Sequence, residues 1–579
     1  MTIIPRPEHP QPQFQRQNWR NLNGQWQFEF DFGKSGRARK WYQKHDFSQE
    51  ITVPFCPESE LSGIHYTDFI AAVWYQKTFE ISQAELAHTT LIHFGAVDYS
   101  SEVYVNGQSV GTHRGGYSSF SFDISQYLIV GENVVTVYAE DDVRSYRQPK
   151  GKQSSEYYSH GCDYTRTTGI WQTVWLEFLP QHHLNQVKFY PNVTQGFVTV
   201  ETETVGHESL NIEVYYQGQL CGQAIFTDDT NHQLHEVKLD QVHLWKVGAG
   251  RLYDVKLTYG EDKVASYFGL REIQMDGYRF LLNGQPVFER LVLDQGFYPD
   301  GIYTAPTDAA LQKDIQLSLD CGFNGARLHQ KAFEPRFLYH ADQMGYLVWG
   351  EMASWGIDLS ANESILDFVP EWQEIVARDF NHPAIVTWCP LNETWNVKDR
   401  PQINDIVKYY YQVTKQLDPT RPCVDTSGNY HVQTDIYDLH DYEQDPEKFA
   451  THYAGEHYEN GEFRDEHDAR QQYTSGLPFG VSEYGGIKWD PNSESETAWG
   501  YGEAPQTMAE FMNRYRGLTE VLLNHPRMFG FCYTQLYDVE QERNGLYYYD
   551  RTPKFNVEEL KAINQQIALS ESPDLDDRR

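Results

Sequence analysis

Two glutamates ninety residues apart, Glu393 and Glu483, could together break a glycosidic bond. Glu393 follows an apolar run that begins at Ala384, and Glu483 follows one that begins at Pro478. Hydrolysis with retention needs one carboxylic acid to protonate the leaving oxygen and one carboxylate to attack the anomeric carbon, about 5–5.5 Å apart. Each glutamate closes a run typical of a buried strand, and two strands of one barrel can hold two carboxylates at that separation.

The elements that must position these glutamates alternate between strand and helix in the second half of the chain. Thr307 is placed to cap a helix that carries Leu311 and Ile315 on one face. A second helix, beginning near Glu334, stops at Gly345, a residue type that favours the left-handed position after a helix. This alternation is typical of parallel strands connected by helices.

Eight candidate strands follow one another in this region. They lie near residues 290, 323, 346, 384, 422, 434, 478 and 529. Eight repeats over roughly 300 residues predict a (β/α)8 TIM barrel, in which catalytic residues lie at the C-terminal ends of the strands. Glu393 and Glu483 end the fourth and the seventh strand. The fifth and sixth strands are close together in the sequence, which makes this stretch the least regular part of the pattern.

The first half of the chain has a different rhythm of short alternating strands separated by turns. Asn106 and Gly107 stand between two such runs, a strong hairpin signal. Alternation without a long helical stripe predicts β-sandwiches up to about residue 272. The region is long for one sandwich, and we divide it after a strand that ends near Phe178. The predicted domains are residues 1–182, 183–272 and 273–579.

The composition excludes several classes of protein. The formal net charge is −35, from 82 acidic and 47 basic residues, which opposes binding to nucleic acid or to anionic lipid. No run of 18 apolar residues predicts a membrane helix, and the first residues lack the apolar core of a secretory signal. The seven cysteines form no C-x-x-C pair. Together these features predict a cytoplasmic protein with free thiols.

Several motifs, in the right order, resemble those of glycoside hydrolase family 2, which contains β-galactosidases, β-glucuronidases and β-mannosidases. Residues 381–393 resemble the acid/base signature of that family, and residues 482–485 resemble its nucleophile signature. Residues 19–26, 94–99 and 163–171 resemble its sugar-binding-like domain. The resemblance implies a jelly-roll β-sandwich, an immunoglobulin-like β-sandwich and a (β/α)8 barrel, in that order. It also implies a homo-oligomer.

The resemblance assigns roles to residues that match the motifs. Glu393 would be the general acid and then the general base, and Glu483 would be the nucleophile. Asn392 would bind the sugar 2-hydroxyl. Arg327 would keep the nucleophile ionised, and Tyr442 would hydrogen-bond to it.

Further polar residues are candidates for contacts with the sugar. Asp163 matches a family aspartate that reaches from the first sandwich to the sugar hydroxyls, although it could instead cap a turn beside Arg166. His440, like Tyr442, could instead be an ordinary residue of the barrel rim. The remaining candidates end predicted strands and are Asp294, Gln295, His329 and Lys331.

The chain also departs from the family pattern. Family β-glucuronidases carry an Asn-x-Lys-Gly loop that binds the sugar carboxylate, and here Asn544 stands where its lysine would be. Residues 293–296 lack the sugar-binding histidine that family members commonly have there, and in residues 327–330 the histidine is moved by one position. Tyr533 stands where many members have tryptophan. These departures predict intact chemistry in a rebuilt sugar pocket.

We therefore predict a retaining exo-β-glycosidase of β-galactosidase-like specificity that acts on small carbohydrates. An arabinopyranoside, a mannoside or a uronide is an alternative substrate. A non-catalytic carbohydrate-binding protein and an interaction protein built on the same scaffold are the other classes. No H-E-x-x-H, no Cys/His cluster and no EF-hand loop occurs, and retaining hydrolysis needs no metal, so no metal or cofactor is predicted.

Overall fold

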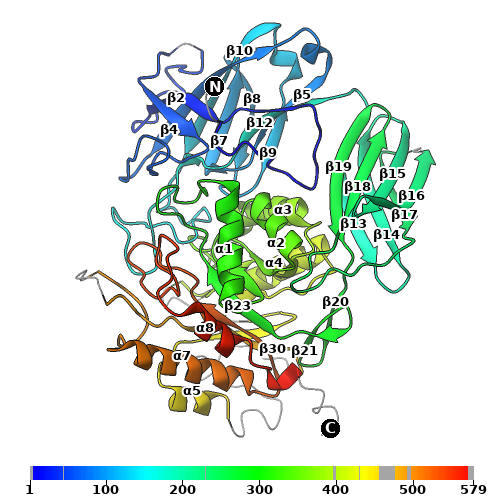
Figure 1. Cartoon of the computed structure of the whole chain (residues 1–579). Helices are drawn as coiled ribbons and strands as arrows, with labels where there is room; N and C mark the ends of the chain where they lie inside the picture. The colour runs from blue at the N-terminus through cyan, green and yellow to red at the C-terminus, as the bar shows by residue number, and fades with distance from the viewer. Residues whose placement is uncertain are drawn as a thin grey trace.

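The computed structural model describes residues 4–43, 45–227, 230–394, 400–428, 431–454, 476–491 and 497–571. Two β-sandwiches lie against one side of a barrel surrounded by helices (Figure 1). This arrangement confirms the predicted fold class of two sandwiches followed by a TIM barrel. The domain boundaries at residues 182/183 and 272/273 stay predictions.

The first sandwich contains two main sheets in the described part of the chain, ordered β1-β12-β5-β9 and β3-β2-β4-β10-β7-β8, and a short pair β11-β6. Its strands are β1 (Trp19–Asn21), β2 (Gly24–Phe30), β3 (Gln49–Val53), β4 (Ala72–Ile81), β5 (Thr89–Phe94), β6 (Val97–Asp98), β7 (Ser100–Val105), β8 (Gln108–Arg114), β9 (Phe120–Asp123), β10 (Gly131–Glu140), β11 (Gly169–Ile170) and β12 (Val174–Leu179). Alternate residues such as Ile92, Val103 and Val137 fill its core. The predicted hairpin turn is confirmed, because Asn106 and Gly107 adopt φ of 50° and 76° between β7 and β8.

The second sandwich pairs β13-β14-β17 with β16-β15-β18-β19. Its strands are β13 (His183–Asn192), β14 (Phe197–Val205), β15 (Ser209–Tyr216), β16 (Gln219–Thr227), β17 (His232–Lys238), β18 (Leu252–Tyr259) and β19 (Asp262–Gly269). All paired strands within it are antiparallel. A three-stranded sheet of β20 (Ile273–Asp276), β21 (Arg279–Leu282) and β22 (Gln285–Pro286) then leads into the barrel.

The barrel strands form a parallel sheet ordered β26-β25-β24-β23-β31-β30-β29, beside the short pair β27-β28. The strands are β23 (Glu289–Asp294), β24 (Gly325–Leu328), β25 (Leu347–Glu351), β26 (Ile385–Cys389), β27 (Leu391–Asn392), β28 (Thr426–Ser427), β29 (Tyr437–Asp441), β30 (Phe479–Gly485) and β31 (Met528–Thr534). The described helices around them are α1 (Asp308–Asp320), α2 (Pro335–Met344), α3 (Ser364–Asp379), α4 (Asn404–Leu417), α5 (Pro446–His452), α7 (Met508–Leu523) and α8 (Val557–Asn564). The irregular fifth strand of the sequence pattern is β28, which has only two residues.

Local signals fix the ends of the barrel helices where they were predicted. The Thr307 hydroxyl accepts a hydrogen bond from the Ala310 amide and caps α1. Gly345 adopts φ of 67° and ends α2. The same left-handed position would be strained for a residue with a side chain, so glycine there sets the exit direction of the chain into β25.

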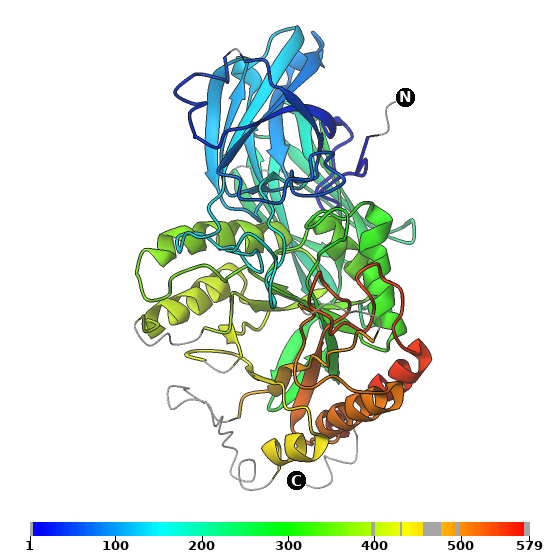
Figure 2. The ribbon, with the colours of Figure 1, turned by 90° about the vertical axis from the view of Figure 1, so that its left-hand side faces the viewer.

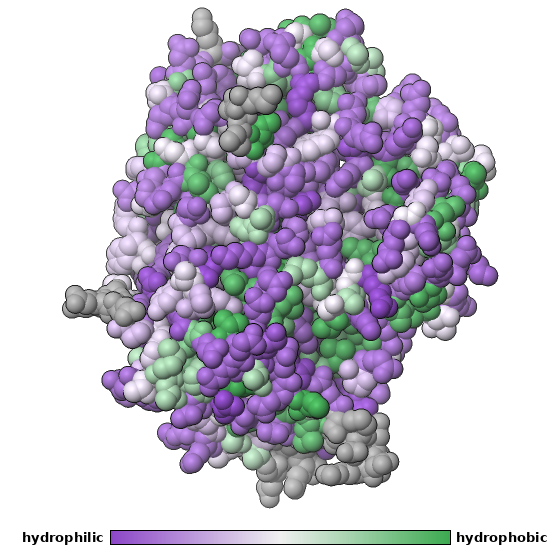
Figure 3. Space-filling model, in the orientation of Figure 1, coloured by the Kyte–Doolittle hydropathy of each residue, from purple (hydrophilic) through white to green (hydrophobic). Residues whose placement is uncertain are grey.

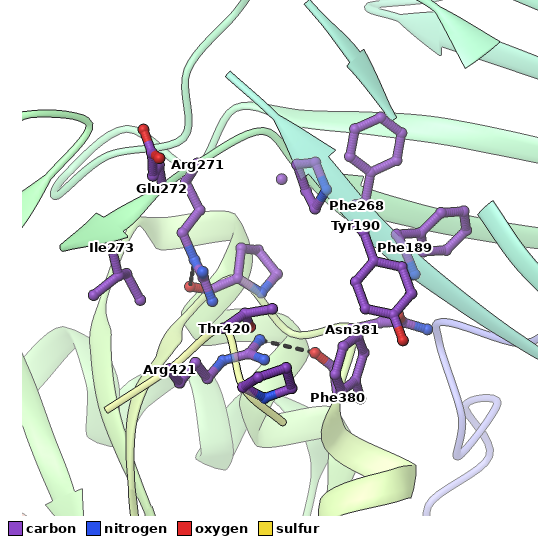
Figure 4. A pocket seen from close by; sticks show the side chains of 14 residues that line it. Phe189, Tyr190, Phe268, Arg271, Glu272, Ile273, Phe380, Asn381, Thr420 and Arg421 are labelled. Atoms are coloured by element: carbon purple, nitrogen blue, oxygen red, sulfur yellow. Dashed lines mark hydrogen bonds between the residues drawn. The ribbon is translucent and has the colours of Figure 1, made fainter. Parts of the chain in front are cut away.

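The second sandwich is held to the barrel by buried arginines (Figure 4). Arg271 donates to the carbonyl oxygens of Pro383 and Ile385, at 3.0 and 2.9 Å. From the barrel side, Arg421 donates to the carbonyl oxygen of Phe380 at 2.8 Å. Burial and the neighbouring charge of Arg421 lower the pKa of Arg271 to about 9. These contacts fix the linker between the second sandwich and the barrel.

A segment of the first sandwich, residues 146–168, extends down to the mouth of the barrel, where Figure 2 shows it as cyan loops. The backbone amide of Lys150 donates to the carbonyl oxygen of Trp355 at 2.7 Å, and the Asp358 amide donates to the Tyr146 carbonyl oxygen at 3.2 Å. Gly151 allows this close approach, since a Cβ there would lie 2.2 Å from the Gln330 carbonyl oxygen. The first sandwich therefore contributes directly to the barrel opening.

The surface is mainly hydrophilic on the face shown in Figure 3, with small scattered apolar areas. No helix among the described residues is long and apolar enough to cross a membrane.

Candidate active site

Arg327, at the end of β24, lies at the centre of the site and is fully buried. Its guanidinium donates to Glu483 Oε1 at 3.1 Å, to Glu351 Oε1 at 2.6 Å and to Asn392 Oδ1 at 3.0 Å. It also donates to the Ser482 carbonyl oxygen at 2.8 Å. One cation thus joins the ends of β24, β25, β27 and β30, and it fixes the positions of Glu483 and Asn392 relative to each other.

Glu483, on β30, is 3% exposed and has a partner on each carboxylate oxygen. Arg327 binds Oε1, and the Tyr442 hydroxyl donates to Oε2 at 2.5 Å. The Tyr442 ring stacks on Tyr501 with a centroid distance of 3.4 Å. Burial and the charge of Glu483 raise the pKa of Tyr442, so this hydroxyl keeps its proton and remains a donor. Glu483 is therefore held in one orientation with a partner on each oxygen, an arrangement that suits a nucleophile.

Glu393 directly follows β27 and has an unusual positive φ of 48°. One of its oxygens lies 2.8 Å from His440 Nδ1, while His440 Nε2 lies 3.4 Å from Glu483 Oε1. Burial favours the neutral carboxyl, but the hydrogen bond and charge of His440 outweigh it and lower the pKa of Glu393. For His440, burial opposes protonation, while Glu483 and Glu393 raise its pKa. The Glu393–His440 pair therefore holds one shared proton in an ion pair.

The separation of the two carboxylates suits retaining chemistry. One oxygen of Glu393, one oxygen of Glu483 and a ring nitrogen of His440 all lie within 4.8 Å of one another. Retaining enzymes hold the two carboxyl groups about 5–5.5 Å apart, whereas inverting enzymes hold them about 6.5–9.5 Å apart. The same three groups are of types that bind metals, but their distances of 2.8 and 3.4 Å through His440 are those of hydrogen-bonded partners. The expected absence of a metal stays a prediction.

Asn392 offers a free donor beside the two glutamates. Arg327 occupies its side-chain oxygen, and its buried Nδ2 has no hydrogen-bond partner among the described residues. Trp355 Nε1 donates to the Asn392 carbonyl oxygen at 3.1 Å and keeps this short strand in place. An amide donor left open at this position can bind a sugar hydroxyl, as expected for Asn392.

The other predicted contact residues occupy different surroundings. His329 Nδ1 lies 3.4 Å from Glu351 and 3.9 Å from Glu483, and burial lowers its pKa, so the ring is neutral beside the nucleophile. Lys331, in contrast, donates to the carbonyl oxygens of Gly296 and Tyr303 at 2.6 and 2.8 Å. Burial lowers the pKa of Lys331 to about 7. Its contacts support the loop after β23.

Asp294 and Gln295 end β23 and belong to a neighbouring polar cluster. The Tyr537 hydroxyl donates to Asp294 at 2.5 Å, and Gln295 donates to Gln535 at 2.9 Å. Burial raises the pKa of Asp294 to about 6. Asp163 lies in the segment from the first sandwich and accepts from Lys150 at 3.1 Å. The roles of these residues in binding sugar stay predictions.

Lys152 was not among the predicted site residues. It lies in the same segment, is 6% exposed, and its ammonium lies 4.1 Å from the centre of the Trp355 ring. Burial opposes its charge, but Cys162 and then the carboxylates of Glu542, Glu393 and Glu483 raise its pKa. Among the described residues it has neither a hydrogen-bond acceptor nor an ion-pair partner for its ammonium.

Glu351 is the other residue that the sequence analysis missed. It ends β25 and binds Arg327, and its second oxygen has no hydrogen-bond partner in the described part of the chain. Its type and position offered the same signal as Glu393 and Glu483, namely an acid that closes an apolar run. Lys152 offered no comparable signal, because its position depends on the docking of two domains.

Three family models match consecutive parts of the chain. The sugar-binding domain of glycosyl hydrolases family 2 matches residues 19–180, a second family 2 model matches residues 182–271, and the family 2 TIM barrel domain matches residues 304–569. With its sandwich–sandwich–barrel order and a pair of glutamates at strand ends, the molecule is a glycoside hydrolase. The chain belongs to glycoside hydrolase family 2.

Relatives within the family carry two different activity names. A putative β-glucuronidase of Formosa agariphila is 28% identical over 60% of this chain and 44% of its own length. A β-galactosidase of Thermoanaerobacter pseudethanolicus is 27% identical over 68% of this chain and 52% of its own length. The chain thus spans about half the length of these two relatives. A β-glucuronidase structure from an uncultured Clostridium species covers 96% of this chain and 99% of its own, with a TM-score of 0.80 at 19% identity, and so shares the fold.

Proposed function

We propose that this protein is a retaining exo-β-glycosidase that removes terminal sugars from small carbohydrates by double displacement. The observation that carries the proposal is the pair of carboxylates within 4.8 Å, each with a different partner. Glu483, paired with a cation and a phenol, attacks the anomeric carbon and forms a covalent glycosyl-enzyme. Glu393 protonates the leaving oxygen with the proton that it shares with His440, and then deprotonates the attacking water.

The neighbouring residues fit these steps. The free Nδ2 of Asn392 donates to the sugar 2-hydroxyl, a contact expected to strengthen in the transition state. Arg327 and Tyr442 hold Glu483 in one orientation until it attacks. Residues 146–168 cover one side of the barrel mouth, which favours the end of a glycan over its middle.

For the sugar, we propose β-galactosidase-like specificity, with a β-uronide as the second candidate. Glu542 and Asn544 replace the two side chains of the carboxylate-binding loop, and they hydrogen-bond to each other at 2.9 Å. A buried carboxylate there disfavours an anionic sugar. Two observations favour the uronide. The ammonium of Lys152 has no acceptor in the described part of the chain, and several relatives carry the name β-glucuronidase.

Release of p-nitrophenol from a panel of β- and α-linked glycosides, with galactoside and glucuronide side by side, tests both candidates. Wild type should cleave one β-glycoside, and NMR should show the β-anomer as the first product. Glu483→Gln should be folded and inactive. Inversion, or undiminished hydrolysis by Glu483→Gln, would contradict the mechanism, whereas a folded wild type that binds sugars without cleaving any would favour the non-catalytic alternative.

Glu393→Ala tests the acid/base role separately. Loss of general acid–base catalysis should lower kcat/KM by about 10²- to 10⁴-fold, most strongly for substrates with poor leaving groups. Azide, which needs no general base, should restore turnover and yield a β-glycosyl azide. Equal losses for good and poor leaving groups, without rescue by azide, would assign Glu393 a structural role.

A further inference from the structure

A cavity of about 350 Å³ lies beside Glu393, between the segment of the first sandwich and the barrel. Asn392 and Glu393 form its inner end, and Glu483 is not among its lining residues. The general acid protonates the oxygen that joins the sugar to its leaving group, so a cavity on the acid's side of the site receives the leaving group. Its volume lies within the range of small-molecule pockets.

Aromatic and aliphatic side chains line one part of this cavity, beside polar side chains such as Ser354, Thr394 and Gln402. Tyr146 lines it from the first sandwich, and Trp355, Ile357 and Leu359 line it from the barrel loop after β25. Tyr146 is 61% exposed, although its backbone is anchored by the hydrogen bond from Asp358. An exposed aromatic side chain on a fixed backbone is available to a ligand.

The charged groups in the same cavity already have partners. Arg400 forms an ion pair with Asp358 at 2.6 Å and lies 4.2 Å from the centre of the Tyr146 ring. Lys150 donates to the Gln153 carbonyl oxygen at 2.6 Å and to Asp163 at 3.1 Å. A charged ligand would therefore have to displace an existing ion pair.

Trp355 is held rigidly in this wall. Its amide donates to the Gln330 side chain at 3.0 Å, its indole donates to Asn392, and its carbonyl oxygen accepts from Lys150. The ammonium of Lys152 lies over its ring. A ring fixed before binding loses little conformational entropy when a flat ligand stacks on it.

We infer that this cavity is the leaving-group subsite and that it selects an uncharged aromatic aglycone, as in a phenolic glycoside. The inference rests on the proposed function and adds the class of substrate. A planar ring stacks on Trp355 and Tyr146 while its glycosidic oxygen lies within reach of Glu393. Among the buried polar atoms of these walls, Asn392 Nδ2, which we assign to the first sugar, and Gln402 Oε1 lack a hydrogen-bond partner in the described part of the chain. A second sugar would therefore find one such atom, an acceptor.

The test compares binding of methyl, cyclohexyl and phenyl 1-thio-β-glycosides, which share one sugar and resist hydrolysis. Calorimetry measures each dissociation constant without turnover, using the sugar that the glycoside panel identifies, or galactose and glucuronic acid in turn if no sugar is cleaved. In wild type, the phenyl compound should bind about tenfold more tightly than the methyl compound, and more tightly than the cyclohexyl compound.

Substitutions at Tyr146 localise the effect. Tyr146→Ala should reduce the phenyl-to-methyl ratio about fivefold, while Tyr146→Phe should preserve it because the ring remains. Tyr409→Ala, a control at an exposed position on α4, should leave the ratio unchanged. Neither Tyr146 nor Tyr409 belongs to the proposed catalytic pair or its hydrogen-bond partners, so the methyl compound should bind equally in all three variants.

The outcomes separate the two proposals. Three outcomes would overturn the aromatic subsite without affecting the proposed hydrolysis. They are a wild-type phenyl-to-methyl ratio near one, a ratio that Tyr146→Ala does not change, and tighter binding of a thio-linked disaccharide than of the phenyl compound. Selective phenyl binding that depends on Tyr146, in a protein that cleaves no glycoside, would support the subsite and refute the proposed function.

Discussion

At the scale of single residues, the two carboxylates that we propose as catalytic differ in the cation that each contacts most closely. Glu483 lies against the permanently charged Arg327, whereas Glu393 lies against His440, whose charge depends on pH. The proposed nucleophile therefore lies beside a fixed positive charge, while the proposed acid/base residue belongs to a pair that gains and loses a proton. This difference matches the two roles, because only one of the carboxyls has to cycle between protonation states.

Replacing His440 with glutamine should shift the pH dependence of activity. The wild-type pair keeps its shared proton until the pH exceeds the raised pKa of His440, whereas the variant retains only the Glu393 carboxyl. We therefore expect the alkaline limb of the kcat/KM profile to move to lower pH in His440→Gln. An aryl glycoside whose leaving group needs no protonation serves as the control and should show a smaller shift. An unchanged alkaline limb would mean that another group supplies the proton.

Replacing Lys152 with methionine should separate activity from stability. Lys152 is 6% exposed and its ammonium has no acceptor among the described residues, so its removal should leave the melting temperature equal or raise it. The loss of a charged contact to the sugar should lower kcat/KM by about 10- to 100-fold. Lys150→Met is the matched control, in which the lost bond to Asp163 should lower the melting temperature. Full activity in Lys152→Met would place this lysine outside sugar binding.

At the scale of elements, the predictable features are those set by neighbours in the sequence. The cap at Thr307, the turn at Asn106 and Gly107, and the placement of Glu393 and Glu483 at strand ends all follow from local patterns. Contacts between distant segments could not be predicted in the same way. Lys152 contacts Trp355 only because the two domains dock. Whether Lys150 or Lys152 faces the pocket depends on the direction of each side chain.

Lys331 shows why position at a strand end does not suffice to define a contact with sugar. It follows β24 closely, as a pocket residue would, yet its ammonium turns toward the carbonyl oxygens of Gly296 and Tyr303. A buried lysine needs acceptors, and the nearest ones belong to the backbone of the preceding loop. The sequence shows the position of such a residue along the strand but not the carbonyl groups within its reach.

Gly151→Ala should test how closely the first sandwich must approach the barrel. Gly151 and Gly161 both have left-handed φ, 57° and 51°, but an added Cβ would lie 2.2 Å from the Gln330 carbonyl oxygen only at Gly151. Gly161→Ala, which meets no atom within 4 Å, should cost about 1 kcal/mol of unfolding free energy. Gly151→Ala should cost more and should also lower kcat/KM by about 10²-fold, because it displaces Lys152 and Trp355. Denaturant unfolding and steady-state kinetics measure both effects, and equal effects of the two changes would contradict tight docking.

At the scale of the whole molecule, buried arginines connect parts that lie far apart in the chain. Arg16 precedes the first strand, yet it pairs with Glu177 of β12 at 3.2 Å and with Asp262 of β19 at 2.8 Å. All three side chains are nearly inaccessible to solvent. The two sandwiches thus share one buried charge cluster.

Arg16→Met should therefore destabilise both sandwiches together. Removal of the cation leaves buried Asp262 without an ion-pair partner among the described residues and leaves Glu177 with His93, at 3.3 Å. We expect a loss of about 3–5 kcal/mol in the free energy of unfolding. Arg20→Met is the control, since its ion pair with Glu85 is partly exposed and should contribute under about 1 kcal/mol. Urea unfolding followed by circular dichroism measures the difference. A loss in Arg16→Met no larger than that in Arg20→Met would show that the junction contributes little to stability.

Because residues 146–168 belong to the first sandwich, the wall of the pocket and the catalytic glutamates are encoded in separate stretches of the gene. Recombination between related genes can replace the first stretch without touching Glu393 or Glu483. A barrel joined to a different sandwich would inherit working chemistry and acquire new side chains at the positions of Tyr146 and Lys152. New substrate preferences can then arise in a lineage in a single exchange, without a period in which the enzyme is inactive.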